Sequence, residues 1–344
     1  MTTVLVTGGS GFVGSHCVIS LLRAGYTVRT TVRSKKKQES VLRILTSQAI
    51  AHTGRLTFLQ ADLLVDEGWR EAVEGCDYVL HTASPFPPTV PADENELIKP
   101  AREGTLRVLR FARDAGVKRV VVTSSSVAVT YGHPHQVEKF TEESWTNVND
   151  PEVPPYAKSK TLAERAAWDF IREEGDGLEL AVINPVGIMG PVISDELSTS
   201  VLIIRQMLEG KLPALPRISF GVVDVRDVVD LHIKAMESPQ ASGERFLALS
   251  DGYISLNEVT HLLKDRLGGA AGKVSSRTIP DWVVRFLARF SRNVRPVLPE
   301  LGNIKDASNG KARKLLNWSP RTIEDSILAT ANTLIRSGYV NVPS

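Results

Sequence analysis

Cysteine is nearly missing from this sequence, and charges of the two signs are almost balanced. The two cysteines, Cys17 and Cys76, lie far apart and lack the spacing of metal ligands. Cys17 falls inside a predicted helix and Cys76 just before a predicted strand, so we expect two buried thiols rather than a disulfide. This usage indicates a reducing compartment. The formal net charge of +2 is too small to indicate nucleic acid or a membrane as a partner.

Long apolar runs are also missing. No segment approaches the ~20 apolar residues that a membrane span needs, and residues 1–7 lack the basic and apolar regions of a signal peptide. We therefore expect a cytoplasmic protein. No metal is expected either, because the pair His133 and His135 has no acidic residue or cysteine at ligand spacing nearby.

The first 125 residues alternate short β-branched runs with amphipathic stretches, which predicts a parallel sheet with crossover helices. Several predicted strands are apolar on both faces, as a sheet covered on both sides requires. The predicted strands are Val4–Thr7, Thr27–Val32, Leu56–Gln60, Tyr78–Thr82, Arg119–Thr123 and, later, Leu178–Asn184. Helices are expected near 12–24, 38–50, 68–74, 93–115 and 156–174. The fold class is therefore α/β, a Rossmann-like doubly wound parallel sheet.

The pattern loosens after Pro185, where further helices are expected near 226–237, 255–267, 280–291 and 322–337. We expect a dinucleotide-binding domain over 1–185, to which a segment of about 221–250 returns, and a mainly substrate-binding lobe over 186–344. The helix near 280–291 carries an apolar stripe that predicts packing against the core or in this lobe. Its members are Ile279, Trp282, Val283, Phe286, Leu287 and Phe290.

A glycine-rich loop joins the first predicted strand to the first helix. Gly8, Gly11 and Gly14 satisfy one dinucleotide spacing, and Gly9, Gly11 and Gly14 satisfy another. Such a loop needs a tight turn and a close backbone approach to a pyrophosphate, which the N–H groups of the following helix then bind. The strand before it and the helix after it favour this interpretation over a purely structural turn.

Acidic residues are absent from residues 1–38, although a site selective for NAD would place one after the second strand. Arg33 follows that strand instead, where its guanidinium can bind a 2′-phosphate, and Lys37 can add a second charge. The cofactor is therefore predicted to be NADP(H). Asp62, after the third strand, is either an acceptor for the adenine amino group or a helix N-cap. Thr82, Ala83 and Ser84 supply small residues where the cofactor would cross the sheet edge.

Tyr156 and Lys160 are four residues apart at the start of a predicted helix, so they share a face. Carbonyl reduction needs an acid to protonate the oxygen. A nearby ammonium and the positively charged oxidised nicotinamide would both lower the pKa of the tyrosine. Ser125, at the end of the strand over 119–123, is our candidate for orienting the carbonyl, with Ser124 and Ser126 as alternatives.

At these residues the sequence resembles the extended short-chain dehydrogenase/reductase superfamily, in its dihydroflavonol reductase, cinnamoyl-CoA reductase and yeast-type aldehyde/ketone reductase branch. The matching stretches are TGGSGFVGSH (7–16), TVRSKKK (31–37), VLHTASPF (79–86), VVTSSS (121–126), YAKSKTLAERAAW (156–168), INPVGIMGP (183–191), VDVRDVVDLH (223–232) and LLNWSPRTIEDSI (315–327). They are spread over nearly the whole chain.

The resemblance implies a role for each matching position. Ser125, Tyr156 and Lys160 match the catalytic triad, and Arg33 and Lys37 match the 2′-phosphate site. The remaining matches are to the pyrophosphate loop (Gly8, Gly11, Phe12, Val13, Gly14), the adenine pocket (Asp62, Leu63) and the nicotinamide surroundings (Thr82, Pro185, Val186). The run Glu152–Tyr156 departs from the sequence that cinnamoyl-CoA reductases carry there, which argues against that activity.

The reaction expected from these features is reversible hydride transfer between NADPH and an aldehyde or ketone. The alternatives are a sugar-nucleotide epimerase or dehydratase of the same fold, and a dinucleotide sensor without catalysis. The substrate is expected to be small and hydrophobic, bound without a dedicated charged group, by a monomer or homodimer. Candidate pocket residues are Phe86, Val127, Tyr131 and Met189.

Overall fold

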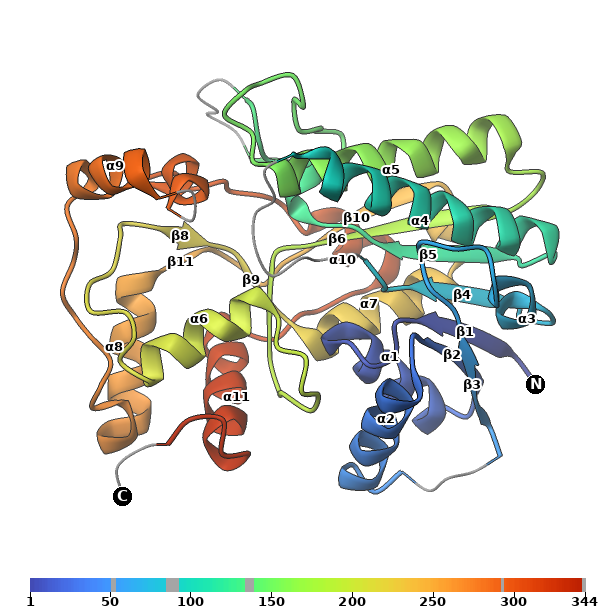
Figure 1. Cartoon of the computed structure of the whole chain (residues 1–344), viewed down its shortest axis with the longest axis horizontal. Helices are drawn as coiled ribbons and strands as arrows, with labels where there is room; N and C mark the ends of the chain where they lie inside the picture. The colour runs from blue at the N-terminus through green and yellow to red at the C-terminus, as the bar shows by residue number, and fades with distance from the viewer. Residues whose placement is uncertain (51–53, 85–92, 134–138, 292–293, 342–344) are drawn as a thin grey trace.

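Seven parallel strands form the central sheet of this computed structural model, which describes residues 1–50, 54–84, 93–133, 139–291 and 294–341. The strand order is β10-β6-β5-β4-β1-β2-β3 (Figure 1). The bounds are β1 (Thr3–Thr7), β2 (Thr27–Val32), β3 (Leu56–Gln60), β4 (Tyr78–His81), β5 (Arg119–Thr123), β6 (Glu179–Pro185) and β10 (Glu244–Ala248).

Two separate apolar cores cover the two faces of the sheet, because its central strands are rich in valine and leucine on both sides. One core joins the sheet to α1 (Phe12–Arg23), α2 (Lys35–Ser47), α7 (Val225–Glu237) and α10 (Gly310–Leu316). The other joins it to α3 (Trp69–Val73), α4 (Asn95–Asp114) and α5 (Pro155–Glu174). The predicted doubly wound α/β fold is thereby confirmed.

A second lobe has its own core. It is built from α6 (Thr199–Leu208), α8 (Leu256–Leu267) and α11 (Ile323–Arg336), with α9 (Asp281–Phe290) at its upper edge in Figure 1. Two short strand pairs belong here, β7 (Gly187–Met189) with β9 (Val222–Asp224), and β8 (Ser219–Phe220) with β11 (Ile254–Ser255).

The later chain returns to the large sheet through α7 and β10, which lie within the 221–250 segment. Ala312, Leu316 and Trp318 also belong to the first core, although they lie beyond that segment. The division at residue 185 itself stays a prediction.

The apolar stripe of α9 is not packed as expected. Val284 and Ala288 are the residues of this helix that turn inward, and the exposed members of the stripe are Trp282, Phe286, Leu287 and Phe290. The prediction of core packing is therefore wrong for these four side chains, because the small buried pair one turn apart defines the packed face.

The direction of chain crossover reverses between β1 and β4, which are neighbours in the sheet although three strands apart in sequence. In open α/β sheets, a crevice opens at the carboxyl ends of the strands at such a point. The glycine-rich loop follows β1 there, and residues 82–84 follow β4.

Candidate active site

The glycine-rich loop makes a tight turn at the end of β1. Gly8 has a left-handed backbone with φ of +69°, and the Gly11 N–H donates to the Gly8 carbonyl over 3.0 Å. A Cβ on Gly14 would collide with the Gly8 carbonyl oxygen, and one on Gly9 would collide with Thr30. The packing of the loop therefore excludes any side chain at Gly9 and Gly14. Such a loop lets the backbone approach a pyrophosphate closely.

Hydrogen bonds tie this loop to the end of β4. The Thr82 hydroxyl donates to the Thr7 carbonyl over 2.7 Å, and the Ala83 N–H donates to the Thr7 hydroxyl over 3.1 Å. No side chain caps the N-terminus of α1 at Gly11, which leaves the first N–H groups of the helix without a capping side chain, as an anion site would require. Phe12 is buried, and Val13 packs at the edge of two cores.

The basic turn after β2 contains an exposed arginine and a lysine that is paired with a glutamate. Arg33 is exposed to solvent just beyond β2. Lys37 forms an ion pair with Glu196, whose carboxylate also accepts a 3.2 Å hydrogen bond from the Ser10 hydroxyl of the glycine-rich loop. Glu196 thus links the two predicted phosphate-binding segments through its own negative charge. Sequence reasoning missed it, because it lies 159 residues from Lys37.

A cavity of about 270 Å³ opens beside β2 and β3, where the adenosine end of a dinucleotide is expected. Asp62 lies just past β3, and its carboxylate accepts a 3.0 Å hydrogen bond from the Leu64 N–H. This hydrogen bond lies within a local turn, so one oxygen of the Asp62 carboxylate already accepts a hydrogen bond from the chain itself. Leu63 packs against Gly104 of α4. The cavity is lined by Val32, Ser34, Lys35, Gln38, Phe58, Leu59 and Gln60.

Tyr156 is the second residue of α5, and its hydroxyl forms a hydrogen bond with Ser125, which follows β5. Burial raises the pKa of Tyr156 to about 12, although the Ser125 hydrogen bond acts to lower it. In the chain itself, desolvation of the phenolate outweighs this hydrogen bond. The lowering expected from Lys160 together with the oxidised nicotinamide stays a prediction. The Ser125 hydroxyl also accepts from the Val127 N–H over 3.3 Å.

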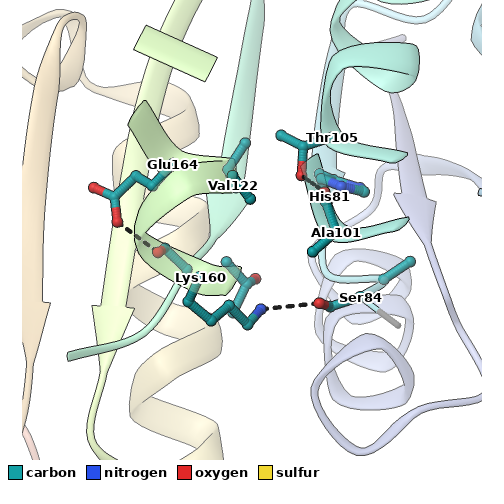
Figure 2. A pocket seen from close by; sticks show the side chains of 11 residues that line it. His81, Ser84, Ala101, Thr105, Val122, Lys160 and Glu164 are labelled. Atoms are coloured by element: carbon teal, nitrogen blue, oxygen red, sulfur yellow. Dashed lines mark hydrogen bonds between the residues drawn. The ribbon is translucent and has the colours of Figure 1, made fainter. Parts of the chain in front are cut away.

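Lys160 lies one helical turn after Tyr156 and reaches across to the end of β4 (Figure 2). Its ammonium donates to the Ser84 hydroxyl over 3.0 Å. Burial lowers the pKa of Lys160 to about 8, and the negative charge of Glu164 opposes that shift. A cavity of about 20 Å³ lies beside it, lined in part by Ser84, Thr105 and Glu164. This volume is about that of one water.

Glu164 is a second functional candidate that sequence reasoning missed. Its fully buried carboxylate accepts from Ser124 over 2.5 Å, from Asn184 over 2.7 Å and from Arg245 over 2.5 Å. The Ser124 hydroxyl therefore bonds within the interior, and Ser125 is the serine that hydrogen bonds with Tyr156. The spacing of four residues from Lys160 to Glu164, on one face of α5, was a signal available in the sequence.

The predicted substrate residues differ in their exposure to solvent. Val127 is partly exposed beside Ser125, whereas Met189 is completely buried in the core of the second lobe and offers no surface to a substrate. This placement corrects the expectation for Met189, since β7 pairs with β9 and turns the side chain inward. Phe86 lies outside the described residues.

Tyr131 contacts a charged pair that was not expected near the pocket. Its hydroxyl donates to the Glu300 carboxylate, and the Lys305 ammonium lies 3.5 Å from the centre of its ring. Burial, followed by the Glu300 charge, raises the pKa of Tyr131 well above its usual range. The charge of the Tyr156 phenolate also acts to raise the pKa of Tyr131.

The end of β6 supplies the last predicted positions. Pro185 is buried as the final residue of β6, and the Val186 N–H donates to the Ala248 carbonyl of β10 over 3.1 Å. The Val186 side chain packs against Gly221, where an added Cβ would meet it at 3.0 Å. Both residues are therefore packed at the carboxyl end of β6, beside β10 and Gly221.

Comparison with known proteins agrees with this architecture. The model of the NAD dependent epimerase/dehydratase family matches residues 4–248. Cinnamoyl-CoA reductase CAD2 of Medicago truncatula is 38% identical over 267 residues, which cover 76% of this chain and 80% of that protein. Ketoreductase azaE of Aspergillus niger is 32% identical over 345 residues, which cover 94% of this chain and 95% of that protein.

Among solved structures, yeast methylglyoxal/isovaleraldehyde reductase Gre2 complexed with NADPH superimposes with a TM-score of 0.80 at 26% identity, covering 98% of this chain and all of that one. The resemblance read from the sequence motifs is thereby confirmed. On the match over 4–248 and on these relatives, the chain belongs to the NAD dependent epimerase/dehydratase family.

Proposed function

We propose that this protein is an NADPH-dependent reductase of aldehydes and ketones, which in reverse acts as an alcohol dehydrogenase. The proposal rests on one observation above all, the hydrogen-bonded pair of Ser125 and Tyr156 with Lys160 one helical turn away. These groups lie at the carboxyl edge of the sheet, beside the glycine-rich loop, where a ligand of such a fold binds.

Three side chains divide the chemistry. The Tyr156 hydroxyl donates its proton to the carbonyl oxygen, and Ser125 orients that oxygen by a hydrogen bond. Lys160 holds a positive charge beside the reaction site and binds ribose hydroxyls. NADPH, when bound, supplies the hydride that adds to the carbonyl carbon. The raised pKa of Tyr156 keeps the acid protonated for reduction, and the proton it gives away returns from solvent.

NADPH is favoured over NADH by the basic turn after β2. Arg33 is exposed there and available for a 2′-phosphate, and no acidic residue occurs before Glu39 to bind a ribose 2′-hydroxyl. The Gre2 structure that this fold matches contains NADPH, which agrees with the same choice. The cytoplasm stays the proposed compartment, because Cys17 and Cys76 are both buried free thiols.

The proposed substrates are small hydrophobic carbonyl compounds. Relatives of this chain are named as reductases of methylglyoxal, isovaleraldehyde and cinnamoyl-CoA, all of which carry a carbonyl group. Cinnamoyl-CoA itself is disfavoured by the run Glu152–Tyr156. Glu300 and Lys305 add a polar end beside Tyr131, so a substrate that carries a hydroxyl or carbonyl group away from the reacting carbon should be preferred.

A sugar-nucleotide epimerase or dehydratase is the alternative within the same family. Such an enzyme oxidises and re-reduces one substrate on a retained NAD, and the basic residue Arg33 argues against NAD selectivity. A dinucleotide sensor without catalysis is the second alternative, and the presence of both Tyr156 and Lys160 argues against it.

The deciding experiment follows NADPH oxidation by absorbance over a panel of aldehydes and ketones. We expect turnover by the unaltered protein and its loss, by at least ~100-fold, in Tyr156→Phe, with NADPH binding nearly intact. A fully active Tyr156→Phe variant would remove the acid role from this residue. Isomerisation of a sugar nucleotide without net NADPH consumption would instead favour the epimerase.

A further inference from the structure

The outer face of α9 is an apolar surface of three aromatic side chains. Trp282 is 71% exposed, Phe286 53% and Phe290 78%, and they follow one another at intervals of four residues. The rings of Phe286 and Phe290 pack edge to face, with their centres 5.3 Å apart. At about 100° per residue, the three side chains fall within an arc of roughly 80° on the helix surface. They therefore form one continuous stripe along the helix.

Arginines border this stripe. Arg285 and Arg289 are exposed on the same helix, on one flank of the aromatic side chains. The one acidic residue of α9, Asp281, is paired with Arg217 over 2.7 Å. Over residues 268–299 the sequence has six lysines and arginines and a single acidic residue, so this segment is more basic than the whole chain, whose net charge is +2.

The charge pattern distinguishes between possible occupants of this surface. A symmetric contact with a second copy of the chain would bring the same patch together twice and place arginines near arginines. An anionic lipid surface instead offers acyl chains to the aromatic rings and negative headgroups to the flanking guanidinium groups. Arginine side chains can also extend toward the headgroups while their stems cover apolar surface.

We propose that α9 binds the surface of anionic membranes, with Trp282, Phe286 and Phe290 inserted at the headgroup level and Arg285 and Arg289 among the phosphates. Among the described helices none is long and apolar enough to cross a bilayer, so the contact is peripheral. It adds a partner that the small net charge of the whole chain did not indicate. The adjoining segment Arg295–Glu300 leads from α9 to the Glu300 contact with Tyr131, which brings the membrane-facing helix close to the proposed substrate site.

The test is co-flotation of the full chain with phosphatidylcholine vesicles that contain about 30% phosphatidylserine, compared with vesicles of phosphatidylcholine alone. We expect binding to the anionic vesicles that weakens as salt is added. The triple variant Trp282→Ser/Phe286→Ser/Phe290→Ser should lose at least about 30-fold in vesicle affinity, and Arg285→Gln/Arg289→Gln at least about tenfold.

A matched control comes from Leu64 and Val65, which are also exposed but follow Asp62 and precede Asp66 and Glu67. Leu64→Ser/Val65→Ser should leave vesicle binding unchanged, and every variant should keep its melting temperature and its turnover of a water-miscible carbonyl compound. Absence of binding to anionic vesicles would overturn the proposal. So would a dimer in analytical ultracentrifugation that the triple variant abolishes. Neither result would bear on the reductase activity, which is measured without lipid.

Discussion

The proposed 2′-phosphate site depends on individual side chains at the end of β2. Arg33 is exposed and carries a full positive charge that a 2′-phosphate can use, whereas the 2′-hydroxyl of NADH cannot. We expect Arg33→Ala to weaken NADPH binding by about 10- to 100-fold and NADH binding by less than about twofold. Fluorescence titration with each nucleotide measures both. Equal losses for the two nucleotides would contradict the 2′-phosphate contact.

Glu196 opposes the same site, because its carboxylate is paired with Lys37 and bonded to Ser10. In the proposed binding mode, a dinucleotide would bring phosphates to these two segments and would repel or displace that carboxylate. Glu196→Gln should therefore tighten NADPH binding by roughly fivefold, while NADH, which lacks the 2′-phosphate, gains less. Glu209→Gln is the matched control, because Glu209 at the end of α6 is also paired with a basic side chain, Arg205. Weaker NADPH binding in Glu196→Gln would mean that the carboxylate supports the bound state.

Lys160 gives a stability prediction whose sign follows from its pKa. Burial lowers the pKa of Lys160 from the ordinary lysine value of 10.5 to about 8, so the charged lysine opposes folding below pH 8. This penalty disappears as pH rises from about 8 through 10.5, where the unfolded chain also loses the proton. Lys160→Met should therefore abolish turnover yet raise the free energy of unfolding near pH 7, by about 1–3 kcal/mol. Urea unfolding should show that the gain in the free energy of unfolding of Lys160→Met is smaller above pH 10 than at pH 7. A gain that is the same at both pH values would contradict the lowered pKa of Lys160.

At the scale of elements, the β1–α1 unit was predictable because everything that defines it is local. A valine-rich strand, three spaced glycines and a following amphipathic stretch lie within residues 3–23. The same holds for Tyr156 and Lys160, which the period of one helix brings together. By contrast, the burial of Met189 depends on pairing with β9, and the exposure of Phe286 depends on which face of α9 meets the lobe. Such long-range packing leaves no local pattern in the sequence.

Two glycines of the β1–α1 loop should behave differently when replaced. A Cβ on Gly14 would meet the Gly8 carbonyl oxygen within the fold, whereas one on Gly11 would come only to 3.3 Å of that oxygen. Gly14→Ala should therefore lower the melting temperature and NADPH affinity together. Gly11→Ala should keep the melting temperature within about 2 °C and lose affinity at least about tenfold, since its methyl group would occupy the loop that is proposed to bind the pyrophosphate. Calorimetry and nucleotide titration separate the two effects, and equal melting temperatures would refute the distinction.

At the scale of the whole molecule, one buried ionic network connects segments that are distant in sequence. Glu164 on α5 contacts Asn184 of β6 and Arg245 of β10, and the Arg245 guanidinium lies 3.7 Å from the centre of the Trp145 ring. Arg245 also donates to the Glu142 and Ser144 carbonyls, over 2.6 and 3.1 Å. The sequence indicated α5 and β6 but could not indicate this contact, because Glu164 and Arg245 are 81 residues apart.

The network should act as a unit in both stability and catalysis. Removing one charge leaves the other buried without its partner, so Glu164→Gln and Arg245→Met should each cost about 3–5 kcal/mol in the free energy of unfolding. The double variant should cost less than the sum of the two, because no unpaired charge remains. Glu164 raises the pKa of Lys160, so its loss should also move the alkaline limb of the activity profile to lower pH. Additive losses of stability would contradict the coupling of the pair. An unmoved alkaline limb would separate Glu164 from Lys160, and would leave the network with a purely structural role in holding β10 to α5.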